Sequence, residues 1–507
     1  MSQITILWIA CPFLVGFVIY LLPKLAKLFA LAIALVSAAY AWQIFTLDAP
    51  LDIQVLDNFG VSLIVDQLSA WFILTNALVT TAVVLYCWQS KTSFFLMQLV
   101  ILHGSVNATF VCADFISLYV ALEVISIGAF LLITYPRSDR SIWVGLRYLF
   151  VSNIAMLFYL MGALLVYKAN NSFYYEGLVN APPEAIALII LGLLAKGGIF
   201  VSGFWLPLTH SESETPVSAM LSGVVVKAGV FPLVRCALLM EDINPIIRIF
   251  GVATALLGVC YAACEQDSKR TLAFSTVSQL GFILAAPVVG GFYALTHGVA
   301  KSALFLIAGN LPSRSFAVLR ERGVDTKIWL ILVIASLSIC GFPLLSGFGA
   351  KVLTSKNLLP WQAIAMNIAT VGTVITFAKF IFLPRQNALL SSSISTVAAS
   401  ASISEATAKI KGETAKSRQM SPGFWWAMVI LLSGLVAASG FYPEVYTLQN
   451  LIKPLLTLII GWVAYLLFFE EFSIVLPRVT EQFNHLIGGM SLILIVIFWM
   501  VQFQWNI

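Results

Sequence analysis

The sequence predicts an all-α membrane protein with about 14–16 transmembrane helices. The chain has 507 residues, of which 60% are hydrophobic and only 10% are charged, and its mean hydropathy is +0.96. Soluble domains carry about 25% charged residues. Apolar runs of about 20 residues, long enough to span a bilayer as a helix, recur along the whole chain. We therefore expect a membrane bundle and no large soluble domain.

Residues 1–92 are predicted to hold helices 1–3 and a surface hairpin. The apolar runs lie at residues 3–23, 26–47 and 66–88. Between the last two runs, residues 49–65 alternate apolar and polar positions around Gly60, a pattern typical of a β-hairpin. We place this hairpin on the outer side of the membrane.

The middle of the chain divides into two predicted repeats of five helices. Residues 93–241 make the first repeat (helices 4–8), and residues 242–385 make the second, inverted repeat (helices 9–13). The ten apolar runs lie at 93–112, 114–135, 143–167, 184–206, 214–239, 245–264, 270–289, 291–311, 327–353 and 361–383.

Helices 7 and 12 are predicted to be broken. Gly197 and Gly198 follow Lys196 in helix 7, and Gly341 and Pro343 precede Lys351 in helix 12. Broken helices at corresponding positions of two repeats are typical of the ion site of an inverted-repeat transporter. Lipid cannot satisfy the backbone groups that a break frees, so each break should line a hydrated path.

The chain ends with a linker and further helices. Residues 386–422 are polar and rich in Ser, Ala and Lys, and we interpret them as a cytoplasmic linker that serves as a flexible tether. Residues 423–507 contain the C-terminal helices, with apolar runs at 424–442, 451–469 and 486–504.

Basic residues in the short loops orient the bundle. They follow helices 1, 3, 5, 9 and 11, and are Lys24, Lys27, Lys91, Arg137, Arg140, Lys269, Arg270, Arg314, Arg320 and Arg322. Because Lys and Arg concentrate in cytoplasmic loops, we expect both termini on the outer side. The net charge of +5 fits this bias and does not require a nucleic-acid partner.

Ionisable residues inside the apolar runs are the candidate functional residues. A charge at the bilayer centre costs roughly 2.5–3.5 kcal/mol on insertion scales, so such groups face one another or a wet cavity. One acid and several bases placed in this way indicate a path for protons or ions. The candidates for proton and ion translocation are Glu123, Lys196, Lys227, His297, Lys301 and Lys351.

Structural roles stay open for several of these residues. Glu123 is alternatively a carboxylate that packs helices, and Lys196 a group that only holds the fold. His297 lies one helical turn before Lys301, and an intramembrane histidine is often a satisfied core residue. The same two readings apply to His103. For Lys379, near the cytoplasmic end of its helix, we favour an ammonium that reaches out to the membrane surface.

The motifs of enzymes and of resident cofactors are not found. The sequence has no phosphate-binding glycine loop and no Ser–His–Asp signature. None of the seven cysteines forms a CxxC pair, which argues against zinc and iron–sulfur sites. We therefore expect no cofactor, no metal and no catalytic residue.

Five stretches of the chain resemble the antiporter-like membrane subunits of respiratory complex I and its relatives and of the Mrp multisubunit antiporters. They lie at 113–132, 193–235, 266–284, 296–309 and 339–353, and include ADFISLYVALEVISIGAFLL and THGVAKSALFLIAG. The run KAGVFPLVR, the HGVAK motif and the SGFGAK stretch make the D-type subunit of the Mrp Na⁺/H⁺ antiporters the nearest resemblance.

The resemblance implies a role for each candidate. Glu123 and Lys196 would be the acid–lysine pair of the first half-channel. Lys227 and His297 would lie on a central polar axis. Lys301 would be the central lysine of the second half, and Lys351 the terminal group.

Three functions remain open from the sequence. The first is the ion-translocating subunit of a Na⁺/H⁺ antiporter in a cell membrane, in a hetero-oligomer with small antiporter subunits and a larger paralogous subunit. The second is a proton-pumping subunit of a complex I-like NAD(P)H or ferredoxin–quinone oxidoreductase. The third is a scaffold that conducts nothing. A thylakoid-type membrane is a further possible location.

Overall fold

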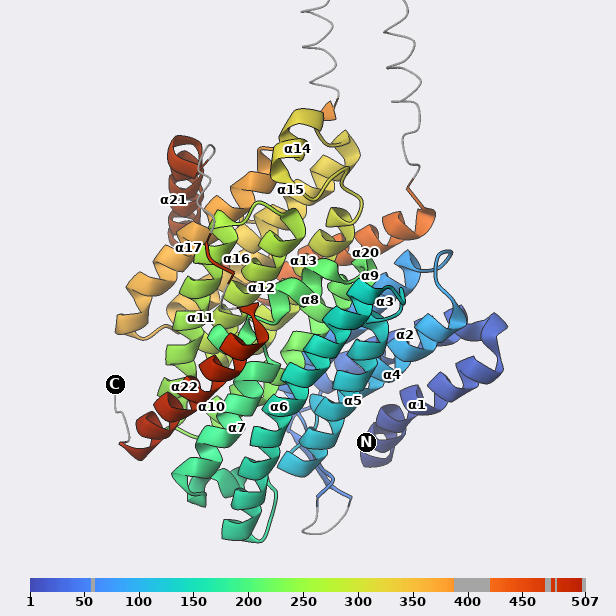
Figure 1. Ribbon diagram of the computed structural model, residues 1–507, viewed down its shortest axis with the longest axis vertical. Coiled ribbons are helices and arrows are strands. Elements are labelled where there is room, and N and C mark those ends of the chain that lie inside the picture. Colours follow the sequence, from blue (N-terminus) through green and yellow to red (C-terminus); the bar gives the residue numbers. More distant parts are fainter. Residues whose placement is uncertain (56–59, 387–419, 470–475, 479–480, 504–507) are drawn as a thin grey trace, which may run out of the picture.

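The fold is a bundle of helices that is all-α apart from one small hairpin (Figure 1). The computed structural model describes residues 1–55, 60–386, 420–469, 476–478 and 481–503. Each of the sixteen apolar runs contains a helix. Among the described residues, twelve helices are long and apolar enough to cross a membrane, and thirteen when a bent pair is counted as one span. The chain is a multi-pass, all-α membrane protein.

Three helices and the hairpin make up the N-terminal part. The helices are α1 (Ser2–Leu21), α2 (Ala26–Phe45) and α3 (Gln67–Tyr86). The hairpin pairs β1 (Leu51–Gln54) with β2 (Ser62–Val65) in antiparallel register, with Leu51 opposite Val65, as the alternation in 49–65 predicted. Asp66 starts α3, because its carboxylate accepts the N–H of Ser69.

The helices of the first predicted repeat follow. They are α4 (Ser93–Thr109), α5 (Phe115–Ile133), α6 (Asp139–Asn170), α7 (Pro183–Lys196), α8 (Leu206–Glu212), α9 (Thr215–Met220) and α10 (Val226–Leu239). Between α9 and α10 lies one turn of π-helix, η4 (Leu221–Val225). Single π turns are rare in proteins, and those that occur often lie at functional sites.

The second predicted repeat and the C-terminal part complete the bundle. Their helices are α11 (Asn244–Cys264), α12 (Ser268–Ala285), α13 (Gly290–Ala308), α14 (Phe316–Arg322), α15 (Thr326–Cys340), α16 (Ser346–Lys356), α17 (Pro360–Ile381), α20 (Pro422–Ala438), α21 (Leu448–Ala464) and α22 (Phe483–Gln502). The inverted relation of the two repeats and the domain boundaries stay predictions. Most of the predicted linker, 387–419, lies outside the described residues.

Both predicted helix breaks are present. The axes of α7 and the segment ending in α8 differ by 42° across a short break, where Gly198 has a φ of +72°. Between α15 and α16, Gly341 has a φ of +86° and Leu344 a φ of +75°. L-residues rarely adopt such angles, which explains glycine at 198 and 341, whereas Leu344 adopts one at the cost of backbone strain. The predicted helix 7 ended at residue 206, and the pattern did not predict α8, in which Thr209, His210 and Ser211 are buried.

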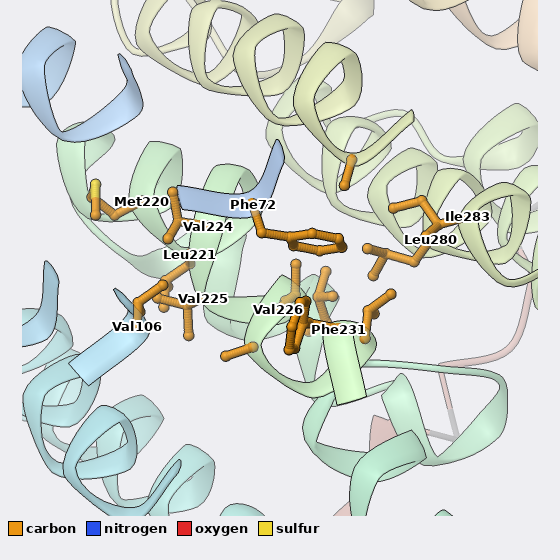
Figure 2. Close-up of a cluster of buried hydrophobic side chains, with 14 of the residues drawn as sticks. Phe72, Val106, Met220, Leu221, Val224, Val225, Val226, Phe231, Leu280 and Ile283 are labelled. Atoms are coloured by element: carbon orange, nitrogen blue, oxygen red, sulfur yellow. The ribbon is translucent and has the colours of Figure 1, made fainter. Parts of the chain in front are cut away.

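The centre of the bundle is formed by α13, which is buried along its whole length, and by the span from α9 to α10, which is buried except at its two ends. In Figure 1, α13 lies in the middle, while α1 and α21 lie at opposite edges. Side chains of α3, α10 and α12 pack into one apolar cluster, which includes Phe72, Phe231, Leu280 and Ile283 (Figure 2).

Candidate proton and ion path

Lys196 is held by hydroxyl groups of two neighbouring helices. It is the last residue of α7 and is buried. Its ammonium Nζ donates to Ser126 Oγ on α5 at 2.5 Å and to Ser152 Oγ on α6 at 2.7 Å. The ring of Tyr148 lies 5.9 Å from the same nitrogen. Two acceptors and an aromatic face together offset part of the cost of burying the ammonium.

Glu123 lies on α5 one turn before Ser126, on the same side of the helix. Its Oε1 is sealed from solvent and has no hydrogen-bond partner among the described residues. Glu123 and Lys196 are close enough for their charges to interact, yet the described structure contains no ion pair between them within 4.0 Å. The residue is half-buried, and its neighbours Val120 and Ile127 face outward.

Lys227, His297 and Lys301 come together at the centre of the bundle. Lys227 Nζ donates to the carbonyl of Ser222 in the π turn at 3.1 Å. α13 passes so near that a Cβ on Gly298 would lie 3.3 Å from Lys227 Cε. Both ring nitrogens of His297 are buried and without a hydrogen-bond partner among the described residues.

Lys301 lies one turn beyond His297 on α13. Its Nζ donates to the carbonyl of Leu272 at 3.0 Å and lies 5.1 Å from the ring of Phe377. The charges of Lys227 and Lys301 act on the His297 ring and on each other. The central group therefore contains three basic side chains and no acid.

Lys351 lies between the central group and a large cavity. A small cavity of about 10 Å³ is lined by both His297 and Lys351, together with Gln279 and Tyr293. It has space for about one water molecule. On its other side Lys351 lines a cavity of about 550 Å³, which Lys356 and Lys453 also line. The Lys351 Nζ atom is not accessible to solvent and lacks a hydrogen-bond partner among the described residues. It lies 5.4 Å from the centre of the Phe282 ring.

The structure adds polar residues that were not among the sequence candidates. Ser126 and Ser152 accept hydrogen bonds from Lys196. Serines in apolar helices most often bond their own backbone, so their positions in the sequence do not predict this contact. Buried His210 on α8 lies between Trp205 and Phe305. The sequence signal for it was a histidine three residues after the WLP run that follows a helix break.

His103 is part of a structural network. Thr80 Oγ1 donates to Asn76 Oδ1, so it accepts from His103 Nδ1 at 2.9 Å. On the other side of the ring, Asn107 Nδ2 donates to His103 Nε2 at 3.0 Å. A neutral ring satisfies both contacts, so the geometry favours a satisfied core residue over a proton carrier.

Lys379 corrects a prediction. We expected its ammonium to reach the membrane surface, but the residue is buried. Nζ donates to the carbonyls of Ala262 at 3.2 Å and Glu265 at 2.8 Å. These carbonyls belong to the C-terminal end of α11, where a cation completes backbone hydrogen bonds and meets the negative end of the helix dipole. Lys379 is a helix cap.

No metal site is evident in the part of the chain that the structure describes, because no three His, Cys, Asp or Glu residues lie close enough to share an ion. The candidate path is thus built from one carboxylate, four lysines and one histidine.

Comparison with known proteins identifies relatives of two kinds. The D-type subunit of the Na⁺/H⁺ antiporter of Alkalihalophilus pseudofirmus is 24% identical over 75% of this chain and 87% of the relative. The N-type subunit of the NADH-quinone oxidoreductase of Desulforudis audaxviator is 30% identical over 75% of this chain and 82% of the relative. The NAD(P)H-quinone oxidoreductase chain 4 2 of Trichodesmium erythraeum is 28% identical, but the match spans only 64% of its length.

Solved structures share the fold. A chain of the membrane-bound sulfane sulfur reductase, an archaeal respiratory membrane complex, superimposes with a TM-score of 0.73 at 21% identity and covers 92% of this chain. A chain of the Mrp complex from Dietzia gives 0.71 at 20% identity over 96% of this chain. Residues 112–376, just over half of the sequence, match the family described as NADH:quinone oxidoreductase/Mrp antiporter, transmembrane. The protein therefore belongs to the NADH:quinone oxidoreductase/Mrp antiporter transmembrane family.

Proposed function

We propose that this chain is the ion-translocating subunit of a multisubunit Na⁺/H⁺ antiporter, and that protons cross it through Glu123, Lys196, Lys227, His297, Lys301 and Lys351. The observation that carries the proposal is the central group. Lys227, His297 and Lys301 are buried, and His297 shares a cavity with Lys351. Burying three basic groups together is costly, and membrane proteins retain such groups mainly where they carry ions.

The first half of the path works by a lysine that changes partners. Lys196 rests on Ser126 and Ser152, one turn of α5 away from Glu123. When Glu123 is ionised, the ammonium is drawn from the hydroxyls toward the carboxylate. When Glu123 takes up a proton, the attraction disappears and Lys196 returns. The position of the lysine thus sets the proton affinity of the acid.

The path suits protons better than Na⁺. A Na⁺ site needs oxygen ligands, and hard cations are held by carboxylates and carbonyls. The candidate path offers one carboxylate against four lysines, and the cavity beside Lys351 is lined by Lys356 and Lys453 as well. This positive lining repels Na⁺. Exchange with Na⁺ would then take place elsewhere in the assembly.

The proposal includes partner subunits. The relatives are subunits of larger assemblies by name, and two of the solved structures are complexes. We propose a hetero-oligomer with smaller antiporter subunits and a larger paralogous subunit in a cell membrane, driven by the proton-motive force.

A second candidate function has specific support. Relatives named as quinone oxidoreductase subunits reach 28–30% identity, above the 24% of the antiporter relative. In that case the same residues would pump protons in a complex driven by quinone chemistry. The two candidates share the path and differ in what drives it.

The test is proton flux in inverted vesicles that lack other antiporters and contain the complete complex. Addition of Na⁺ should move protons across the vesicle membrane only if exchange occurs. Flux that requires a quinone substrate and ignores Na⁺ would transfer the proposal to the redox pump. Flux that survives Glu123→Ala and Lys196→Ala would leave the scaffold as the remaining function.

A further inference from the structure

A charged pocket lies at the end of the bundle that we expect to be cytoplasmic. It has a volume of about 560 Å³ and lies between the start of α6, α8, the start of α12 and the residues just before α22. Five arginines line it against three carboxylates, which leaves the pocket positive. It is separate from the six residues of the candidate path.

Four of the five arginines are engaged in ion pairs. Arg140 and Arg314 lie 3.1 Å and 3.5 Å from the carboxylate of Glu212, and Arg314 also contacts Asp267 at 2.8 Å. Arg270 pairs with Glu265 at 3.0 Å. Arg478 lies 3.3 Å from Glu265, and Arg270 also pairs with Glu481. The pocket carboxylates are therefore already committed to other guanidinium groups.

Arg147 is the exception. Its Nε and Nη2 atoms are sealed from solvent and have no hydrogen-bond acceptor among the described residues. Glu481, whose charge acts on Arg147, already pairs with Arg270. A buried donor without an acceptor costs about 1–3 kcal/mol, and more when it is charged. The two free N–H groups of a guanidinium form a planar fork that matches the oxygens of a phosphate.

The position of Arg147 fits a lipid headgroup. Arg147 lies eight residues after the first residue of α6, about 12 Å along the helix axis. Arg140, Trp143 and Arg147 follow one another at helical spacing on one face, and both guanidinium groups lie over the Trp143 ring. Trp143 is half exposed, as is typical of aromatic residues at the membrane–water interface.

Apolar side chains lie in and near the pocket. Leu208 forms part of its lining, and Leu146 and Phe150, the next outward residues of α6, are exposed. A ligand with an anionic head and apolar tails would contact the arginines and this surface at once. Basic pockets between membrane helices on the cytoplasmic side are suited to anionic lipid headgroups.

We propose that this pocket binds the phosphate of an anionic phospholipid. Arg147 donates hydrogen bonds to the phosphate oxygens, and the nearby positive charges of Arg140 and Arg314 attract the phosphate. The proposal does not depend on which ion the chain transports. Free inorganic phosphate has the same anionic oxygens, so the test must separate the two sources.

The experiment measures the thermal unfolding of the delipidated complex in detergent with phosphatidylglycerol, phosphatidylcholine or inorganic phosphate. We expect phosphatidylglycerol to raise the midpoint, and phosphatidylcholine, whose choline carries a positive charge, to have little effect. Arg147→Gln should raise the phosphatidylglycerol concentration needed for the shift at least tenfold. Arg140→Gln should act in the same direction, because it also frees Glu212 to repel the phosphate.

Arg322→Gln is the matched control, since Arg322 is exposed on the same side and does not line the pocket. It should respond like the parent. An equal shift with inorganic phosphate alone would support the anion site and assign it to a soluble phosphate. If no ligand shifts the parent, or if both pocket variants respond as the parent does, the proposal is wrong. If Arg147→Gln does not fold, the response of Arg140→Gln to phosphatidylglycerol tests the proposal. The Arg140 side chain is 58% exposed, so we expect its substitution to leave the fold intact.

Discussion

Lys196 is the residue at which the structure adds most to the sequence. A lysine in an apolar run predicts a partner, and Glu123 was the acid expected to pair with it. The structure places two serine hydroxyls on the ammonium instead. The sequence could not predict this, because the contact depends on how α5, α6 and α7 pack. The same limit applies to Lys379, whose burial comes from α11.

Removing the two hydroxyls should impair transport more than stability. In a Ser126→Ala/Ser152→Ala variant, Lys196 loses both acceptors and is drawn permanently toward Glu123. Hydrogen bonds to a charged group contribute about 1.5–3 kcal/mol each, so we expect proton flux to fall by about tenfold or more. The assay is Na⁺-dependent proton flux at matched expression.

Ser105→Ala is the control, since Ser105 is buried on α4 and bonds only the carbonyl of Ile101 in its own helix. Flux close to the parent value in the double variant would show that the serines do not position Lys196 for transport.

The ion pair between Asp66 and Arg235 makes a prediction about acid stability. Burial alone would raise the pKa of Asp66, but the hydrogen bonds and charge of Arg235 hold it below its usual value of 3.8. A lowered folded-state pKa contributes stability that is fully present above pH 3.8 and is lost as the pH falls further. Asp66→Asn keeps the helix cap, because Asn caps as well as Asp, but removes the charge.

We expect Asp66→Asn to lose about 1–3 kcal/mol at pH 7, since the buried Arg235 is then left without its charged partner. The difference in unfolding midpoint between parent and variant should shrink as the pH is lowered below 3.8. A difference that stays constant down to pH 3 would mean that the pair does not stabilise the fold.

At the scale of elements, the apolar runs were sufficient to place a helix in all sixteen positions. The glycines in helices 7 and 12 also predicted the breaks. The apolar runs ended before α8, although its residues Thr209, His210 and Ser211 are buried. The π turn before Lys227 has no sequence signature, because its geometry follows from the close packing of η4 against α13 at Gly223 and Gly298.

Gly341 links a helix break to a candidate site residue. Its φ of +86° disfavours any side chain, and a Cβ there would lie 2.9 Å from Lys351 Cδ. Gly341→Ala should therefore cost about 1 kcal/mol or more in stability and displace Lys351, with a clear loss of flux.

Gly440→Ala is the matched control, because a Cβ at Gly440 meets no atom within 4 Å and its φ is not positive. Circular dichroism melts and flux assays compare the two. If both alanine variants behave alike, the break after α15 does not constrain Lys351.

At the scale of the whole molecule, the apolar runs predicted which charged residues are buried, and only the family resemblance implied that Lys227 and His297 share an axis. Lys227 and His297 are 70 positions apart and come together because α13 packs against α9 and against the π turn η4, which directly precedes α10. The cavity beside Lys351 likewise needs α21, a helix far along the chain. Figure 1 places α21 at the edge of the bundle beside α17.

The cavity beside Lys351 gives a test of orientation. The basic loops predict that the start of α21 faces outward, and Asn450 lines the cavity there. In a variant without native cysteines, Asn450→Cys should react with a membrane-impermeant thiol reagent added from outside. Ile459→Cys, half exposed on the apolar surface of α21, should not react. Labelling of Asn450→Cys only from inside would reverse the predicted topology.

The central claim is that one buried path carries protons in exchange for Na⁺. The most direct measurement is Na⁺-dependent proton flux by the complete complex in inverted vesicles, with Glu123→Ala, Lys196→Ala and Lys351→Ala beside the parent. The account predicts flux in the parent and at least a tenfold loss in each variant that still assembles. Undiminished flux in assembled variants, or a parent that moves protons only when a quinone substrate is supplied, would contradict it.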